Sequence, residues 1–148
     1  MESWIKEQWR QNLNDLGLLW LRVTFGLTMA YLHGLPKLLN FSERADTFRD
    51  PLGIGSAPSL FLAMGAEFFC SLLLVLGLFT RAAALPLLFT MFVIVFIVQA
   101  GNDMSGSREV AVLFGLCYLT LMLTGPGKYS LDHIWMKRRE KKAEGPQE

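Results

Sequence analysis

The sequence predicts an all-α protein, a four-helix transmembrane bundle. Of its 148 residues, 52% are hydrophobic and 18% are charged, and the mean hydropathy is +0.34. Soluble domains usually carry about 25% charged residues. The apolar residues also gather in four long blocks, which short polar segments rich in glycine and aspartate separate. The length suits one domain, so we expect a single membrane domain over residues 1–148.

The four apolar blocks cover about residues 16–39, 58–79, 82–99 and 108–124. A helix rises about 1.5 Å per residue, so roughly 17–25 residues cross a hydrocarbon core about 30 Å thick. Inside hydrocarbon the backbone must bond to itself, which favours helices. The polar start of the chain and the length of the first block do not match a cleavable signal, and we expect this block to stay as an anchor.

Turn-forming residues mark the ends of the blocks. A Gly-Pro-Gly run at 125–127 follows the fourth block. Glycine accepts a left-handed backbone and proline cannot continue a helix, so the fourth helix should stop there. Pro36 predicts a kink or an end of the first helix after Leu32. Thr80, in the tight turn before the third block, is the N-cap that the sequence suggests.

Lysine and arginine predict the orientation, because they favour the cytoplasmic side of a membrane protein. We expect a multi-pass protein of the cell inner (plasma) membrane with both termini cytoplasmic. The inner side then holds Lys6, Arg10, Arg81, Lys128, Lys137, Arg138, Arg139, Lys141 and Lys142, and the outer side holds Lys37, Arg44, Arg49 and Arg108. The basic tail over 128–148 is then either a solvated flank or a segment lying on anionic lipid.

Several classes of function find no support in the sequence. A net charge of +1 argues against binding of nucleic acid, which needs a clear basic excess. The two histidines, His33 and His133, are expected on opposite membrane sides, so no metal site is predicted. No phosphate-binding loop or nucleophile-elbow motif is present. Cys70 and Cys117 are interpreted as small core residues, with a redox-active thiol pair as the alternative.

Charged residues inside the apolar blocks are the most informative feature. A charge near a helix centre costs about 2.5–3.5 kcal/mol on insertion scales. His33 and Lys37 lie four residues apart and share a helix face. Arg22 lies eleven residues before His33, about three turns, and shares this face as well. Glu67 lies in the middle of the second block, and Glu109 begins the fourth.

These positions predict a polar site in the outer half of the bundle. We expect the side chains of His33, Lys37, Glu67 and Glu109 to converge there, as a site for a ligand or a proton. The residues expected at its rim are Gln99, Asn102 and Asp103.

Each of these residues also has a structural interpretation, which the sequence leaves open. Glu67 can form an ion pair that fixes the register of two helices. Lys37 can extend to the headgroups. Glu109 can interact with a helix dipole. Arg22 has Asp132 as its candidate ion-pair partner or extends to the inner interface.

The residues resemble the DoxX family of small four-helix membrane proteins over about residues 16–132. The first block matches the family pattern R…HG..K with Arg22, His33, Gly34 and Lys37. The segment AEFFCSLLLVLGLFTRAAAL carries Glu67, the Gly77-Leu78 turn and Arg81, for which a structural role is expected. Glu109 opens the fourth helix, and GPGKYSLD matches the family's G-P-G-x-x-S-x-D ending.

The resemblance implies quinone-linked redox work, because the family takes its name from a subunit of a terminal oxidase and thiosulfate:quinone oxidoreductase system. Three hypotheses follow. In the first, the protein is an accessory subunit of a membrane oxidoreductase, with a redox partner protein, and the site binds a quinone or a small sulfur compound. In the second, it is a structural or assembly partner without its own ligand. In the third, it transports a small molecule or lipid, which would favour a homo-oligomer.

Overall fold

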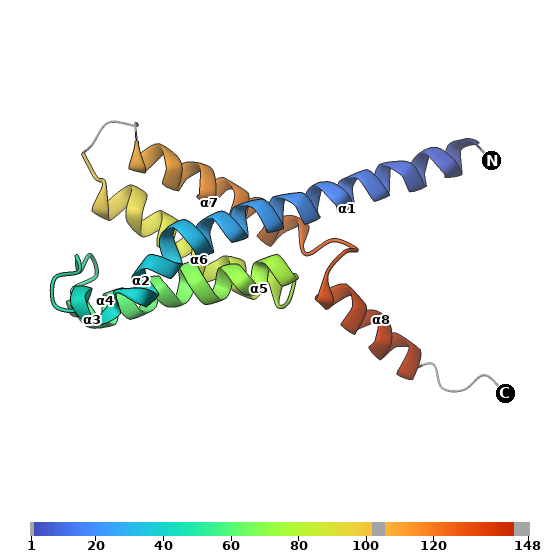
Figure 1. The fold of residues 1–148 in the computed structure, drawn as a ribbon. Helices are drawn as coiled ribbons and strands as arrows, with labels where there is room; N and C mark the ends of the chain where they lie inside the picture. The colour runs from blue at the N-terminus through green and yellow to red at the C-terminus, as the bar shows by residue number, and fades with distance from the viewer. Residues whose placement is uncertain (1, 102–105, 144–148) are drawn as a thin grey trace.

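The protein is an elongated helical bundle, shown by a computed structural model that describes residues 2–101 and 106–143 (Figure 1). These residues form helices and turns, with no strand among them. The predicted all-α class is therefore confirmed. Of the residues expected at the rim of the site, Asn102 and Asp103 lie outside the described ranges.

The first helical rod is interrupted by a π-helical segment. It consists of α1 (Glu2–Met29), the π-helix η1 (Ala30–Gly34) and α2 (Leu35–Leu39). Pro36 lies in the first turn of α2, where its ring lacks an N–H and crowds the carbonyl four residues earlier. The π turn accommodates this, because the N–H of Leu35 donates to the carbonyl of Ala30, five residues back. The interruption predicted after Leu32 is thus a change of helix type.

The rest of the chain folds back alongside this rod. After the short α3 (Phe41–Arg44) and a loop, the remaining elements are α4 (Ser56–Met64), η2 (Gly65–Cys70), α5 (Ser71–Leu76), α6 (Thr80–Val93), η3 (Ile94–Val98), α7 (Ser107–Thr124) and α8 (Leu131–Ala143). The segment α4–η2–α5 forms one continuous helix, and α6–η3 forms another.

Three helices within the described residues are long and apolar enough to cross a membrane: Ser56–Leu76, Thr80–Val98 and Ser107–Thr124. At about 1.5 Å per residue, their lengths match a hydrocarbon core about 30 Å thick. At most 39% of the apolar window of each helix is buried inside the protein. Large apolar side chains therefore face outward, as a lipid environment allows, and the chain is a membrane protein.

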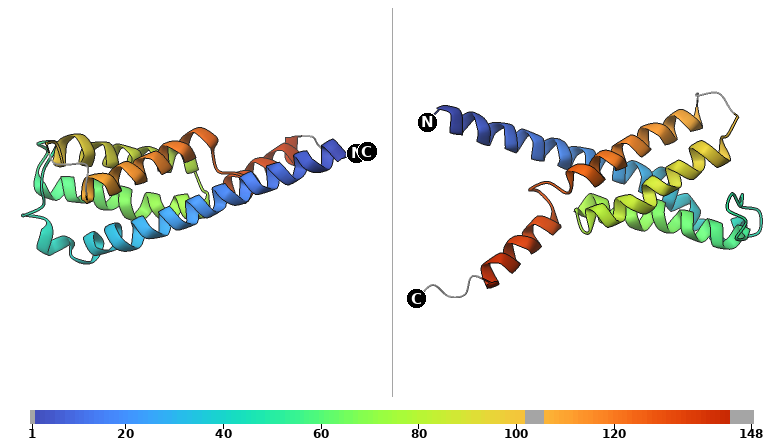
Figure 2. Two further views of the ribbon diagram at one scale, coloured as in Figure 1. Left: turned by 90° about the horizontal axis from the view of Figure 1, so that it is seen from above. Right: turned by 180° about the vertical axis from the view of Figure 1, so that it is seen from behind.

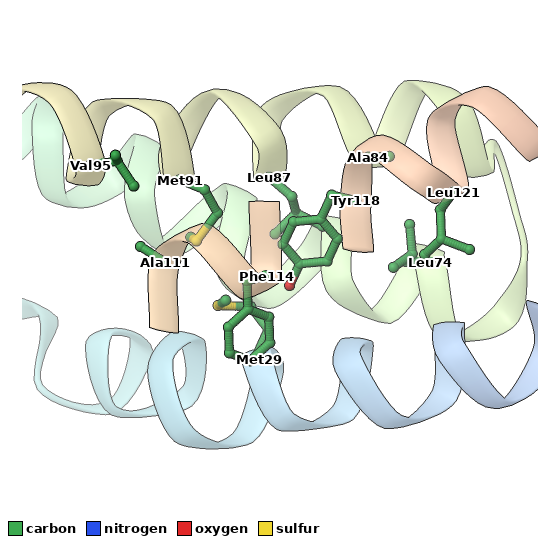
Figure 3. Packing of buried hydrophobic residues seen from close by; sticks show 10 residues of the cluster. All are labelled: Met29, Leu74, Ala84, Leu87, Met91, Val95, Ala111, Phe114, Tyr118 and Leu121. Atoms are coloured by element: carbon green, nitrogen blue, oxygen red, sulfur yellow. The ribbon is translucent and has the colours of Figure 1, made fainter. Parts of the chain in front are cut away.

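The helices pack around a core that runs along the bundle. α1 packs against α5, η1 packs against η2, and α6 packs along α7. Figure 3 shows the buried cluster between them: Met29, Leu74, Ala84, Leu87, Met91, Val95, Ala111, Phe114, Tyr118 and Leu121. The N-terminal half of α1 and the whole of α8 extend beyond this core. Both termini lie at the same end of the bundle (Figure 2).

The turn between α5 and α6 is closed by glycine and by a distant carboxylate. Gly77 adopts φ +67°, and the N–H of Leu78 donates to the carbonyl of Leu73 at 2.9 Å, which satisfies the helix end. The N-cap predicted at Thr80 is wrong, because Thr80 is already the first residue of α6. The carboxylate of Asp132 takes over this role and accepts the N–H groups of Phe79 and Thr80 at 2.8 and 2.9 Å.

Candidate functional site

The centre of the candidate site is an ion pair between two helices. The ammonium of Lys37, on α2, donates to the carboxylate of Glu67, on η2. Glu67 is only 3% exposed and lies about midway along the helix Ser56–Leu76. Lys37 also donates to the backbone carbonyl of His33 at 3.3 Å. Burial of a charge is costly unless it is paired, so this pairing explains how Glu67 is tolerated in the bundle.

Close contact between two π-helical segments positions this pair. η1 and η2 pack against each other at Gly34. A Cβ at Gly34 would lie 2.7 Å from the backbone of Glu67 and Phe68, so only glycine fits. π-helical turns are rare and occur frequently at functional sites. Here they carry two of the predicted residues, since His33 lies on η1 and Glu67 on η2.

A cavity of about 300 Å³, which we call the His33 cavity, opens on one side of Glu67. Its polar groups come from His33, Glu67 and Ser107. The imidazole of His33 meets the ring of Phe114 edge-on, with 6.1 Å between the ring centres. The other lining residues are Met29, Met91, Ile94, Val110, Ala111 and Phe114. The cavity therefore combines an imidazole and a carboxylate with mostly apolar walls.

A second cavity, of about 460 Å³, is also lined by Glu67, and we call it the apolar cavity. Lys37, Arg49, Ser59 and Thr90 supply polar groups beside Glu67. The remaining lining residues, which include part of the α3–α4 loop, are Phe48, Pro51, Leu52, Leu62, Ala63, Ala66, Pro86, Phe89, Val93, Ile94 and Val98. Glu67 thus forms part of the wall of both cavities.

Asp50 holds the α3–α4 loop in place beside the apolar cavity. Its carboxylate accepts the N–H groups of Ile54 and Gly55 at 3.1 and 2.6 Å and the hydroxyl of Ser59 at 2.7 Å. Hydrogen bonds to the charged form, first from Ser59 and then from Gly55, lower the pKa of Asp50. The charged carboxylate therefore stabilises this loop.

The structure brings three of the four predicted residues together. Lys37, Glu67 and His33 meet around the two cavities. Glu109 instead lies exposed in the first turn of α7 and lines neither cavity. Gln99, expected at the rim, follows η3 directly.

A second polar cluster lies at the end of the bundle that holds the termini. The fully buried Arg22 donates to the backbone carbonyl of Tyr129 at 2.6 Å. Its predicted partner Asp132 is close enough to act on it through its charge, but this carboxylate bonds to the turn before α6. Arg81 lies near the end of α7 and donates to the carbonyl of Leu123 at 3.5 Å. These contacts join α1 to the segment before α8, the start of α6 to α8, and α6 to the end of α7.

Sequence reasoning missed the π-helical segments, the capping by Asp132 and the loop contacts of Asp50. Gly34 was part of the recognised pattern and signals close helix contact. Asp132 belongs to the segment GPGKYSLD, but only the folded chain brings it to Phe79. Cys70 and Cys117 are free thiols and half-buried.

Comparison with known proteins identifies the family of the chain. The family model of DoxX matches residues 17–100, more than half of the chain. An uncharacterised protein of Haemophilus influenzae is 33% identical over 116 residues, which cover 74% of this chain and 84% of the relative. No solved structure matches the chain. From the family match and this relative, the chain belongs to the DoxX family.

Proposed function

We propose that this protein binds the headgroup of a quinone in the His33 cavity, as an accessory subunit of a membrane oxidoreductase. The observation that carries the proposal is the position of Glu67, a buried carboxylate shared by two cavities and paired with Lys37. Ionisable groups at this depth are usually functional. An imidazole and a carboxylate that line a mostly apolar cavity suit a ligand with two polar oxygens on an apolar ring.

In this proposal, the residues of this chain position the quinone and transfer protons to it. Reduction of a quinone to a quinol takes up two electrons and two protons. A partner oxidoreductase supplies the electrons in this proposal. The imidazole of His33 donates a hydrogen bond to one quinone oxygen, and Glu67 takes up protons that originate in the aqueous phase and passes them to the oxygens of the reduced quinone. The apolar cavity beside Glu67 has the size and lining that part of an isoprenoid tail requires.

Quinone binding by purified protein in nanodiscs tests the proposal, with ubiquinone and menaquinone analogues as the probes. Glu67→Gln and His33→Phe should each weaken binding about 10- to 100-fold, because hydrogen bonds to charged groups are worth about 1.5–3 kcal/mol. Glu109→Gln is the matched control, since Glu109 is exposed and lines neither cavity. Unchanged binding in Glu67→Gln would remove this carboxylate from the mechanism.

A second candidate function is that of a structural partner without a ligand, and the direct Lys37–Glu67 contact favours it. A double variant separates the two. Breaking a buried pair on one side costs about 3–5 kcal/mol, whereas replacing both partners by apolar residues is often neutral. Lys37→Met with Glu67→Leu should therefore restore stability relative to Glu67→Leu alone. In the quinone proposal this stable double variant still fails to bind quinone, while a structural partner binds none even as wild type.

We further infer a fourth crossing of the membrane by the rod α1–η1–α2, with both termini in the cytoplasm of the cell that carries it. Both termini lie at one end of the bundle (Figure 1), which requires an even number of crossings. The charge supports the orientation, because lysine and arginine are concentrated at that end.

A further inference from the structure

A third cavity lies outside the core, between the α5–α6 turn and α8, and we call it the α8 cleft. It measures about 280 Å³ and is lined by Leu78, Phe79, Leu131, Ile134, Trp135 and Arg138. Figure 2 shows α8 leaving the bundle beside this turn, at the end where both termini lie. The cleft is thus apolar and aromatic, with one guanidinium in its wall. It shares no lining residue with the His33 cavity.

Phe79, which forms part of the aromatic wall of the cleft, has a strained backbone conformation. Phe79 has φ +49°, and it is the one non-glycine residue with positive φ in the described part of the chain. The left-handed region costs about 1–2 kcal/mol for residues with a side chain. The two hydrogen bonds from Phe79 and Thr80 to Asp132 offset this cost. As a result, the ring of Phe79 lies edge-on to the indole of Trp135, 6.1 Å between centres.

Positive charge surrounds this apolar wall. Four exposed cations follow Trp135 within two turns: Lys137, Arg138, Arg139 and Lys142. The guanidinium of Arg139 lies over the indole of Trp135, 4.1 Å from the ring centre. The acidic residues nearby are Glu140, which lies among these cations, and Asp132, whose carboxylate is bonded to the N–H groups of Phe79 and Thr80. The surface therefore offers apolar walls next to a basic rim, within reach of the membrane surface.

We propose that the α8 cleft is a binding site for an anionic phospholipid of the leaflet at which both termini lie. The phosphate pairs with Arg138, since guanidinium matches phosphate geometry. The glycerol and upper acyl region contacts Leu78, Phe79 and Trp135, which suits the preference of aromatic rings for the interface. A water-soluble anion would use the charges alone, so the apolar walls select the lipid. This site does not depend on quinone binding.

Fluorescence quenching of Trp135 by lipid tests the site. The variant Trp4→Phe/Trp9→Phe/Trp20→Phe leaves Trp135 as the reporter, in vesicles that contain either brominated phosphatidylglycerol or brominated phosphatidylcholine. We expect stronger quenching by phosphatidylglycerol. Arg138→Gln should lower this preference at least tenfold, because it removes a charge-assisted hydrogen bond to the bound phosphate in addition to a surface charge.

Lys142→Gln is the matched control. It removes the same charge from the same helix, one turn further on, but Lys142 does not line the cleft. A bound lipid predicts a much larger effect of Arg138→Gln than of Lys142→Gln. Equal effects would instead indicate a diffuse basic surface, and the absence of any preference for phosphatidylglycerol in the reporter protein would indicate a surface for something other than lipid. Either result overturns the proposal.

A second variant separates lipid contact from a merely structural role of Phe79. Glycine adopts φ +49° without strain, so Phe79→Gly should keep or raise the melting temperature. It should nevertheless reduce the phosphatidylglycerol preference, because the aromatic wall is lost. Unchanged lipid preference in this stable variant would contradict the site.

Discussion

At the scale of single residues, one close contact between two helices brings the ion pair of Lys37 and Glu67 together. Gly34 lets η1 approach η2 so closely that the ammonium of Lys37 reaches Glu67. The sequence predicted that Lys37, His33 and Glu67 would meet, because helix periodicity and membrane depth follow from residue numbers alone. It could not place Glu109, because the rotation of α7 about its own axis depends on packing.

Gly34→Ala should destabilise the bundle, because the new methyl would lie 2.7 Å from the backbone of Glu67 and Phe68, which cannot move aside as a side chain can. Overpacking costs about 1–3 kcal/mol, so thermal unfolding in detergent should show a clearly lower melting temperature. Gly65→Ala is the control on the facing helix, where a methyl meets nothing within 4 Å. Equal melting temperatures of Gly34→Ala and wild type would rule out this close contact.

Among the elements, the apolar helices follow from composition, whereas their ends and their irregular turns do not. The observed helices Ser56–Leu76, Thr80–Val98 and Ser107–Thr124 begin and end within three residues of the apolar blocks. α7 ends at Thr124, directly before Gly125, as the Gly-Pro-Gly run predicts. The start of α6 was misjudged because the capping group, Asp132, lies 52 residues away along the chain.

Asp132→Ala should destabilise the start of α6, because it removes the acceptor for the N–H groups of Phe79 and Thr80. Loss of a capping side chain costs about 0.5–2 kcal/mol, and here it also releases the strained Phe79. Hydrogen exchange measures the effect as faster exchange of the Thr80 amide. Asp132→Asn keeps one oxygen acceptor and should show a smaller increase. Wild-type protection in Asp132→Ala would mean that this carboxylate does not cap the helix.

The loop between α3 and α4 should lose stability in acid. The pKa of Asp50 is lowered in the folded protein, first by the hydroxyl of Ser59. Its contribution is therefore complete above the ordinary carboxyl pKa of about 4 and is lost as the pH falls through the lower folded value. Hydrogen exchange of the Gly55 amide should lie well below that of Asp50→Asn near pH 6 and should approach it as the pH falls through the lowered pKa of Asp50.

Asp46→Asn is the matched control for this loop, because Asp46 is an exposed carboxylate of the same segment. Its substitution should leave the pH dependence of Gly55 exchange unchanged. A pH dependence that persists in Asp50→Asn would assign the acid sensitivity to another group.

For the molecule as a whole, topology follows from charge and from the positions of the termini. If the C-terminus is cytoplasmic, as proposed, a green fluorescent protein fused to it should fluoresce, whereas alkaline phosphatase at the same place should be inactive. A cysteine introduced at Ser42, an exposed position in α3, should react with an impermeant thiol reagent added from outside. Labelling of that position only after lysis would reverse the orientation, and active phosphatase at the C-terminus would exclude both termini inside.

The shared position of Glu67 has a thermodynamic consequence. A ligand in the His33 cavity and a tail or acyl chain in the apolar cavity would both contact the carboxylate of Glu67, which is paired with Lys37. Whatever one occupant does to that pair changes the affinity for the other, and the coupling is reciprocal by linkage. If both proposed occupants bind, a lipid tail in the apolar cavity would therefore change the affinity of the polar site for its ligand, and the ligand would change the affinity for the tail by the same factor.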